Sequence, residues 1–136
     1  MRAAILILLA ATAVLTAGCG AVNRVTSGDP STGKKLFQEK CGSCHTLADA
    51  GTKGVVGPNL DNAFAFVKEQ GFKEQTIRDV VRGQIAYPEA NPGTGTPTAP
   101  NPGMTPNLVH GQDAKDVSFY VAKCAAVPSC GVTATP

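Results

Sequence analysis

The chain has 136 residues, enough for one domain and a leader but not for a second hydrophobic core. Its formal net charge of +2 includes Arg2, in a segment that we expect to be removed, so the rest of the chain is nearly neutral and gives no argument for nucleic-acid binding. Five cysteines are many for this length, and a cytosolic protein would have to keep them reduced or bound to metal.

The N-terminus has the pattern of an export signal, in which a charged start is followed by an apolar run over residues 3–17. About 15 apolar residues are fewer than the roughly 17–25 of a membrane span. Residues 15–19 resemble the bacterial lipobox, whose cysteine is lipidated and becomes the new N-terminus, although Thr16 stands where that motif usually has Leu. We therefore expect a signal peptide over residues 1–18 and a lipid on Cys19, with ordinary cleavage or an uncleaved anchor as the alternatives.

The segment after the leader, residues 19–30, is rich in Gly, Asn, Ser and Asp, a composition typical of a flexible tether. We expect one domain over residues 31–131, followed by a short tail at 132–136. Within the domain, apolar residues recur at helical spacing in four places, which predicts four helices.

The first helix is expected over about residues 31–44, with Ser31 or Thr32 as its N-cap. Residues 46–61 form a loop by their Gly and Pro content, and a short helix follows over 62–70. The inward-facing residues of these two helices are Gly33, Phe37, Cys41, Cys44, Phe64 and Val67.

The third helix is expected to begin at Thr76, with Asp79 completing a capping box, and to end before Pro88. Residues 88–106 contain too many Pro and Gly for regular structure, and the last helix covers about 111–126. The apolar faces of these helices comprise Ile77, Val80, Val81, Ile85, Val117, Tyr120, Val121 and Cys124. With no alternating strand pattern and no repeat, the predicted class is all-α with long loops.

The motif that carries chemistry is Cys41-Gly42-Ser43-Cys44-His45, the pattern by which c-type haem is attached. Positions i, i+3 and i+4 of a helical turn share one face, so two thiols and one imidazole can meet the same porphyrin. The thiols of Cys41 and Cys44 form thioethers to the vinyl groups, and His45 ligates the iron. A zinc site would need a fourth nearby ligand, and a thioredoxin-type pair would need a βαβ setting that the chain lacks.

The second side of the iron decides the function, because a filled site transfers electrons and an open site binds small molecules. Met104 is the only methionine besides the initiator, and it lies in a Pro- and Gly-rich loop where a core methionine is not expected. We predict Met104 as the second axial ligand. The alternatives are His110, which would give a bis-histidine haem, and a five-coordinate iron.

Over about residues 31–126 the chain resembles the small monohaem cytochromes c of class I. That family has an N-terminal helix ending in Cys-x-x-Cys-His, a Gly-Pro-x-Leu loop, a methionine loop and a C-terminal helix, and all four occur here in order. The resemblance implies a small cytochrome c fold of about four helices wrapped round one haem c per chain. A Pro-rich stretch over residues 88–103 departs from the pattern and leaves the path of that loop open.

The resemblance also assigns roles to single residues. The carbonyl of Pro58, in the Gly57-Pro58-Asn59-Leu60 loop, is implied to accept the proton on the second nitrogen of His45 and so to orient that ring. Gly33, Phe37 and Tyr120 match the positions at which the first and last helices cross, with Val117 beside them.

The two remaining cysteines, Cys124 and Cys130, are separated by a segment that can turn at Pro128. In an oxidising compartment a disulfide is the default for such a pair, and free thiols are the alternative. With a lipid on Cys19, every cysteine then has a use.

These features together predict an electron carrier, not an enzyme, exported and tethered by lipid to the outer face of the bacterial cytoplasmic membrane or located in the periplasm. Its expected partners are redox proteins, such as respiratory complexes or other exported oxidoreductases. The alternatives are a haem-bearing subunit of a larger oxidoreductase and an open-site haem enzyme or gas sensor.

Overall fold

The computed structural model describes residues 24–88 and 103–136. Within them the elements are α2 (Pro30–Lys40), β1 (Thr46–Leu47), β2 (Thr52–Lys53), α3 (Leu60–Glu69), α4 (Glu74–Ala86) and α5 (Gly111–Cys124). The predicted all-α class is confirmed, because four helices make up nearly all of the regular structure. The leader with Cys19, and the loop at 89–102, lie outside the described residues.

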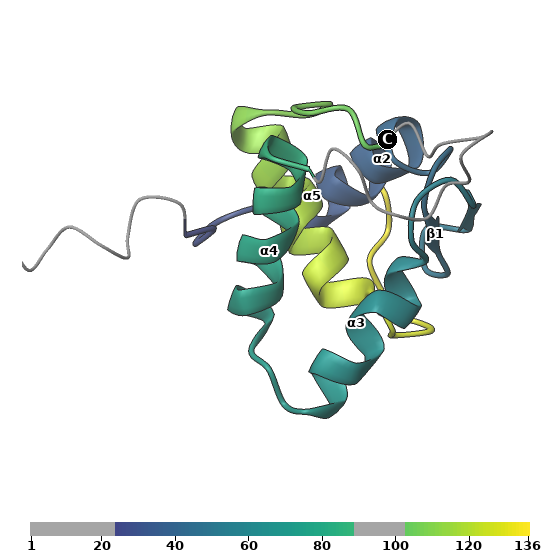
Figure 1. Ribbon diagram of the computed structural model, residues 1–136, viewed down its shortest axis with the longest axis vertical. Coiled ribbons are helices and arrows are strands. Elements are labelled where there is room, and N and C mark those ends of the chain that lie inside the picture. Colours follow the sequence, from purple (N-terminus) through teal and green to yellow (C-terminus); the bar gives the residue numbers. More distant parts are fainter. Residues whose placement is uncertain (1–23, 89–102) are drawn as a thin grey trace, which may run out of the picture.

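Helix α5 is the centre of the packing, since α2 crosses it and α4 lies along it (Figure 1). Gly33 lies at the crossing, where an added side chain would overlap the carbonyl of Asp116 and reach within 2.8 Å of Tyr120 Cβ. Phe37 and Tyr120 are both buried, and their rings meet edge to face with centroids 5.9 Å apart. The predicted helix crossing is therefore confirmed, with the small residue permitting close approach of the two backbones.

Helix α2 differs from its prediction at both ends. Its N-cap is Asp29, whose carboxylate accepts a hydrogen bond of 2.9 Å from the backbone N–H of Ser31, so neither Ser31 nor Thr32 is the cap. The helix ends at Lys40 and not at residue 44, because the N–H of Gly42 donates to the Phe37 carbonyl five residues back and so leaves the i→i−4 pattern of an α-helix.

Helices α3 and α4 also begin earlier than expected. The side chain of Asn59 caps α3 by accepting from the N–H of Asn62 at 3.2 Å. The predicted capping box of α4 is wrong, because the helix already begins at Glu74 and Asp79 bonds a different segment. Val80 was expected to face inward but is 48% exposed, whereas the other predicted core positions of α4 are buried or half-buried.

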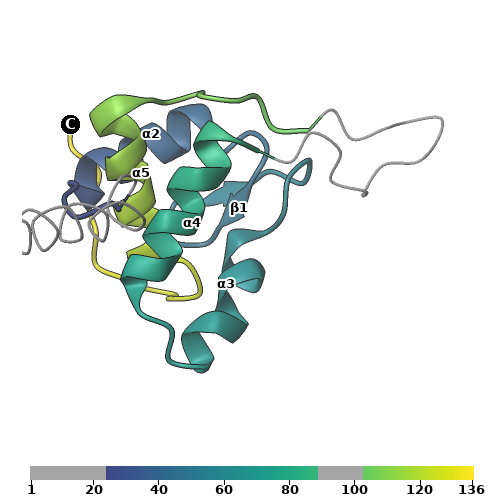
Figure 2. The ribbon, with the colours of Figure 1, turned by 60° about the vertical axis from the view of Figure 1, so that its left-hand side comes forward.

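The segments before α2 and after α5 both pack against the helices of the domain. Residues 24–30, which we expected to belong to a flexible tether, instead lie on α4 and α5: Val25 is 1% exposed, and its N–H donates to Asp79 Oδ1 at 2.8 Å. The tail at 132–136 runs beside α2, where Lys34 Nζ donates to the carbonyl of Val132 at 2.7 Å (Figure 2).

A small antiparallel hairpin, which the sequence did not indicate, follows the Cys41–His45 motif. Thr46 pairs with Lys53 and Leu47 with Thr52, and Leu47 is fully buried. Among the described residues, no helix is both long and apolar enough to cross a membrane.

Candidate functional site

The motif residues form a tight turn at the end of α2. The N–H groups of Cys44 and His45 donate to the Cys41 carbonyl at 3.0 and 2.9 Å. The Cys41 side chain is buried in the core, whereas Cys44 is exposed and His45 is half-buried. In the part of the chain that the structure describes, Cys41 and Cys44 are the cysteines with free thiols.

The ring of His45 is held in one orientation by the loop that follows the hairpin. Its Nδ1 lies 2.9 Å from the carbonyl oxygen of Pro58. Because a carbonyl can only accept, Nδ1 carries the proton and the lone pair is on Nε2, the nitrogen available to a metal. The contact inferred from the resemblance is thus present in the structure.

Two glycines let this loop wrap closely round the motif. A side chain at Gly57 would reach within 2.7 Å of His45 Nδ1 and 2.9 Å of Nε2, so only hydrogen fits against the ring. A side chain at Gly54 would come within 2.6 Å of the His45 backbone nitrogen. The cradle around His45 therefore depends on the absence of Cβ at both positions.

Burial raises the pKa of the Cys41 thiol to about 11, with a smaller contribution from the nearby Cys44. Without a cofactor, the Cys41 thiol therefore stays protonated at neutral pH. This is the environment of a buried, unreactive cysteine and not that of a nucleophile with a lowered pKa.

Met104 and His110 lie in the segment that leads into α5. Met104 is half-buried and packs against the same hydrophobic core that contains Cys41. His110 is exposed at the position before α5 and its side chain makes no capping hydrogen bond. The assignment of Met104 as iron ligand stays a prediction.

A haem fits the residues present. The donor set offers two free thiols and one imidazole with its Nε2 lone pair available. Among the described residues, several large apolar side chains are exposed: Val55, Val56, Phe66, Phe72, Val80, Tyr87 and Leu108. Helix α3 is amphipathic, yet none of its residues is buried.

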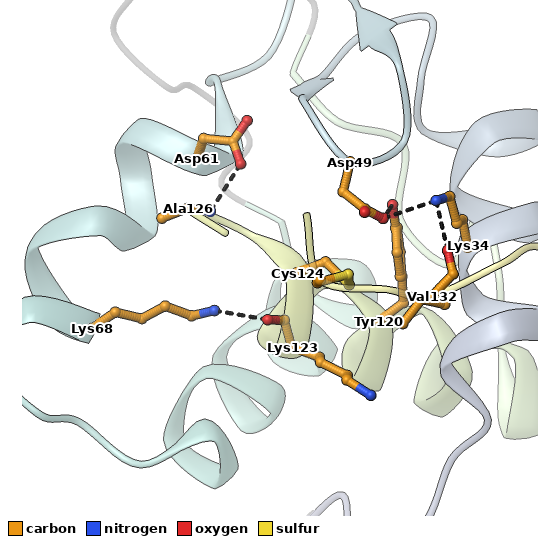
Figure 3. Close-up of a disulfide and its surroundings, with 10 residues drawn as sticks. Lys34, Asp49, Asp61, Lys68, Tyr120, Lys123, Cys124, Ala126 and Val132 are labelled. Carbon is orange, nitrogen blue, oxygen red and sulfur yellow. Dashed lines mark hydrogen bonds and ion pairs between the residues drawn. A yellow bond between two sulfur atoms is a disulfide. The ribbon is translucent and has the colours of Figure 1, made fainter. Parts of the chain in front are cut away.

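The predicted pair Cys124 and Cys130 is joined by a disulfide in the structure. Close to it, Tyr120 donates its hydroxyl to Asp49 Oδ2 at 2.8 Å, and Lys34 forms an ion pair with the same carboxylate at 3.0 Å (Figure 3). Burial, and then the hydrogen bond to Asp49, raises the pKa of the Tyr120 hydroxyl.

Sequence reasoning missed the polar residues that hold these segments together, chiefly Asp49 and Asp61. Asp61 accepts hydrogen bonds from the N–H groups of Ala48 and Ala126, which are far apart in the sequence. The only local indication of a role for Asp61 was its place in the first turn of a helix. The favourable interaction of an acidic residue with the helix dipole would by itself explain that place.

Comparison with known proteins agrees with the geometry. The sequence profile of the family described as "Cytochrome c" matches residues 30–125. Among curated proteins, the chain is 49% identical over 37 residues to a cytochrome c of Ulva intestinalis and 50% identical over 36 residues to a cytochrome c of Theileria annulata. The matched segments make up 27% and 26% of this chain, and 32% and 30% of the respective relatives.

Proposed function

Because this chain belongs to the cytochrome c family, and so carries a covalently bound haem c, we propose that it passes single electrons between redox proteins. Such a haem supplies an iron that changes reversibly between its ferrous and ferric states. The observation that carries the proposal is the hydrogen bond from His45 Nδ1 to Pro58, beside two free thiols.

The residues that would hold the haem are Cys41 and Cys44 through their sulfur atoms, His45 through Nε2 and Met104 through its thioether sulfur. The Pro58 carbonyl fixes the tautomer and the ring orientation of His45 and increases its basicity. Ligation by His45 and Met104 would raise the reduction potential and leave no open position for a substrate, which suits an electron carrier and not an enzyme.

We further propose that the protein acts outside the cytoplasm. The support is the export pattern over residues 1–18, the lipobox-like segment ending in Cys19, and the disulfide between Cys124 and Cys130, a bond typical of oxidising compartments. Lipidation of Cys19 would place the domain at the outer face of the bacterial cytoplasmic membrane, near its proposed partners, respiratory complexes or other exported oxidoreductases.

A pyridine haemochrome spectrum of the purified protein tests the cofactor and its attachment. We expect one c-type haem per chain, retained on a denaturing gel. Cys41→Ser and Cys44→Ser should each lose one thioether, whereas Ser43→Ala, in the same turn, should keep both. Haem that is extracted by acid acetone from the unaltered protein would contradict covalent attachment. The mass of the mature N-terminus, compared with that of Cys19→Ser, tests lipidation separately.

A further inference from the structure

Helix α3 is attached to the rest of the domain by polar contacts at both of its ends. None of its residues is fully buried, although Leu60 and Phe64 are half-buried and pack against the hydrophobic core. In its first turn, Asp61 Oδ1 accepts the N–H of Ala126 at 2.8 Å. Near its end, Lys68 Nζ donates to the carbonyl of Lys123 at 3.1 Å (Figure 3). Both bonds lead to the C-terminal end of α5 and the turn that follows it.

The second oxygen of the Asp61 carboxylate reaches a different segment. Asp61 Oδ2 accepts the N–H of Ala48 at 2.8 Å. Ala48 lies three residues after His45, and Asp61 lies three residues after Pro58. One side chain therefore joins the two short segments that carry the donor and the acceptor of the His45–Pro58 hydrogen bond, and fixes both to the end of α5.

The N–H of Ala126 is presented to Asp61 by an unusual turn. Ala126 has a left-handed backbone conformation with φ of 59°, which is uncommon for a residue with a Cβ. The turn is closed by the Cys124–Cys130 disulfide and by a 3.0 Å bond from the Val127 N–H to the Cys124 carbonyl. The disulfide thus stabilises the backbone that donates to Asp61.

We propose that Asp61 is a positioning residue for the haem ligand His45. By tying the start of α3 to the disulfide turn and to the segment after His45, its carboxylate holds the Pro58 carbonyl against Nδ1, and so sets how strongly Nε2 donates to iron. This inference rests on the proposed function, because it concerns the properties of a haem-bound His45.

The test uses the holo-protein with Asp61→Asn, and Glu69→Gln as the control. An amide side chain has one acceptor oxygen, so in Asp61→Asn one of the two backbone N–H groups loses its partner. Glu69 is exposed at the end of the same helix, and its replacement removes the same charge. NMR would measure the exchange of the His45 ring N–H with solvent, and electrochemistry the midpoint potential.

We expect the ring N–H to exchange about fivefold faster in Asp61→Asn than in Glu69→Gln, as expected for the loss of one net hydrogen bond. The midpoint potential should be higher in Asp61→Asn, because a less basic imidazole stabilises ferric iron less. A helix that was merely destabilised would unfold more easily without moving these two signals. Equal exchange rates and equal potentials in the two variants would overturn the inference.

A second variant keeps the test decisive if Asp61→Asn does not take up haem. Cys124→Ala with Cys130→Ala opens the turn while Asp61 stays in place, and should also accelerate exchange of the His45 ring N–H. Unchanged exchange there would rule out the disulfide turn as the support of Asp61. If the unaltered protein contains no covalent haem, the proposed function itself fails, and this result is distinct from either outcome above.

Discussion

The hydroxyl of Tyr120 and the carboxylate of Asp49 are 2.8 Å apart, and this hydrogen bond joins the last helix to the turn of the hairpin that follows the Cys41–His45 motif. Tyr120 is fully buried, and Asp49 also pairs with Lys34 at 3.0 Å. The contact connects residues 71 positions apart in the sequence, so it fixes the hairpin relative to the crossing of α2 and α5.

Tyr120→Phe should keep the ring packing against Phe37 but remove this hydrogen bond. Since hydrogen bonds to charged groups contribute about 1.5–3 kcal/mol, we expect the free energy of unfolding to fall by about 2 kcal/mol. Denaturant unfolding of the holo-protein measures the change. Tyr87→Phe is the matched control, because Tyr87 is 83% exposed and loss of its hydroxyl should change stability little. Equal effects of the two substitutions would show that the Asp49 contact is not stabilising.

Gly57→Ala should disturb the proposed haem ligand His45 directly, because the added Cβ would overlap the imidazole ring. We expect lower haem occupancy and an altered spectrum of the protein that does bind haem. Gly83→Ala provides the comparison: an added Cβ meets nothing within 4 Å, and the residue lies within α4. That substitution should raise the free energy of unfolding by about 0.5–1 kcal/mol without spectral change. A normal haem spectrum in Gly57→Ala would contradict the conclusion that the His45 ring needs a residue without a Cβ at position 57.

Asp79→Ala should release the N-terminal segment from α4, because Asp79 accepts the N–H of Val25. We expect faster hydrogen exchange at that amide and a loss of about 1–3 kcal/mol in unfolding free energy. Asp113→Ala is the control, because it removes the same charge from an exposed position in the first turn of α5. It should lower the unfolding free energy by less than Asp79→Ala does. If the Val25 amide exchanges at the rate of an unstructured chain in the unaltered protein, the segment is a free tether after all.

Acid should weaken the cap of α2. Hydrogen bonds from Ser31, first from its hydroxyl and then from its backbone N–H, lower the pKa of Asp29 below its ordinary value of 3.8. A carboxyl with a lower pKa in the folded state stabilises above its unfolded pKa, and this contribution is lost as the pH falls through the folded value. The stability difference between the unaltered protein and Asp29→Asn should therefore shrink between about pH 5 and pH 2. A difference independent of pH would contradict an ionised cap.

The Cys41–His45 motif could be recognised because it depends on a short spacing, whereas the crossing of the first and last helices was implied by the family resemblance. Cys41, Cys44 and His45 are close in the sequence, so their spacing alone places them on one side of a helical turn. Periodicity likewise identifies the helical faces on which Gly33, Phe37 and Tyr120 lie. The Pro58 contact required the family resemblance, since nothing in a Gly-Pro turn indicates which side chain its carbonyl meets.

The rest depends on contacts between distant segments. Ser31 and Thr32 are residue types that often cap helices. Asp29 is the N-cap instead, because its carboxylate accepts hydrogen bonds from both of these residues at once. The composition of the N-terminal segment is typical of a linker. Its contact with α4 through Val25 joins residues that are far apart in the sequence, so it could not be predicted from local pattern. Asp61 was overlooked for the same reason, because its two partners are 13 and 65 residues away.

The measurement that tests the electron-carrier account most directly is the absorption spectrum of the purified holo-protein, ferric and then ferrous with carbon monoxide. We predict a low-spin ferric spectrum with the far-red band of methionine ligation, and no carbon monoxide binding. Met104→Ala should lose the band, whereas His110→Ala should keep it. A high-spin ferric spectrum, or ready binding of carbon monoxide by the ferrous protein, would contradict the account and indicate an open iron site.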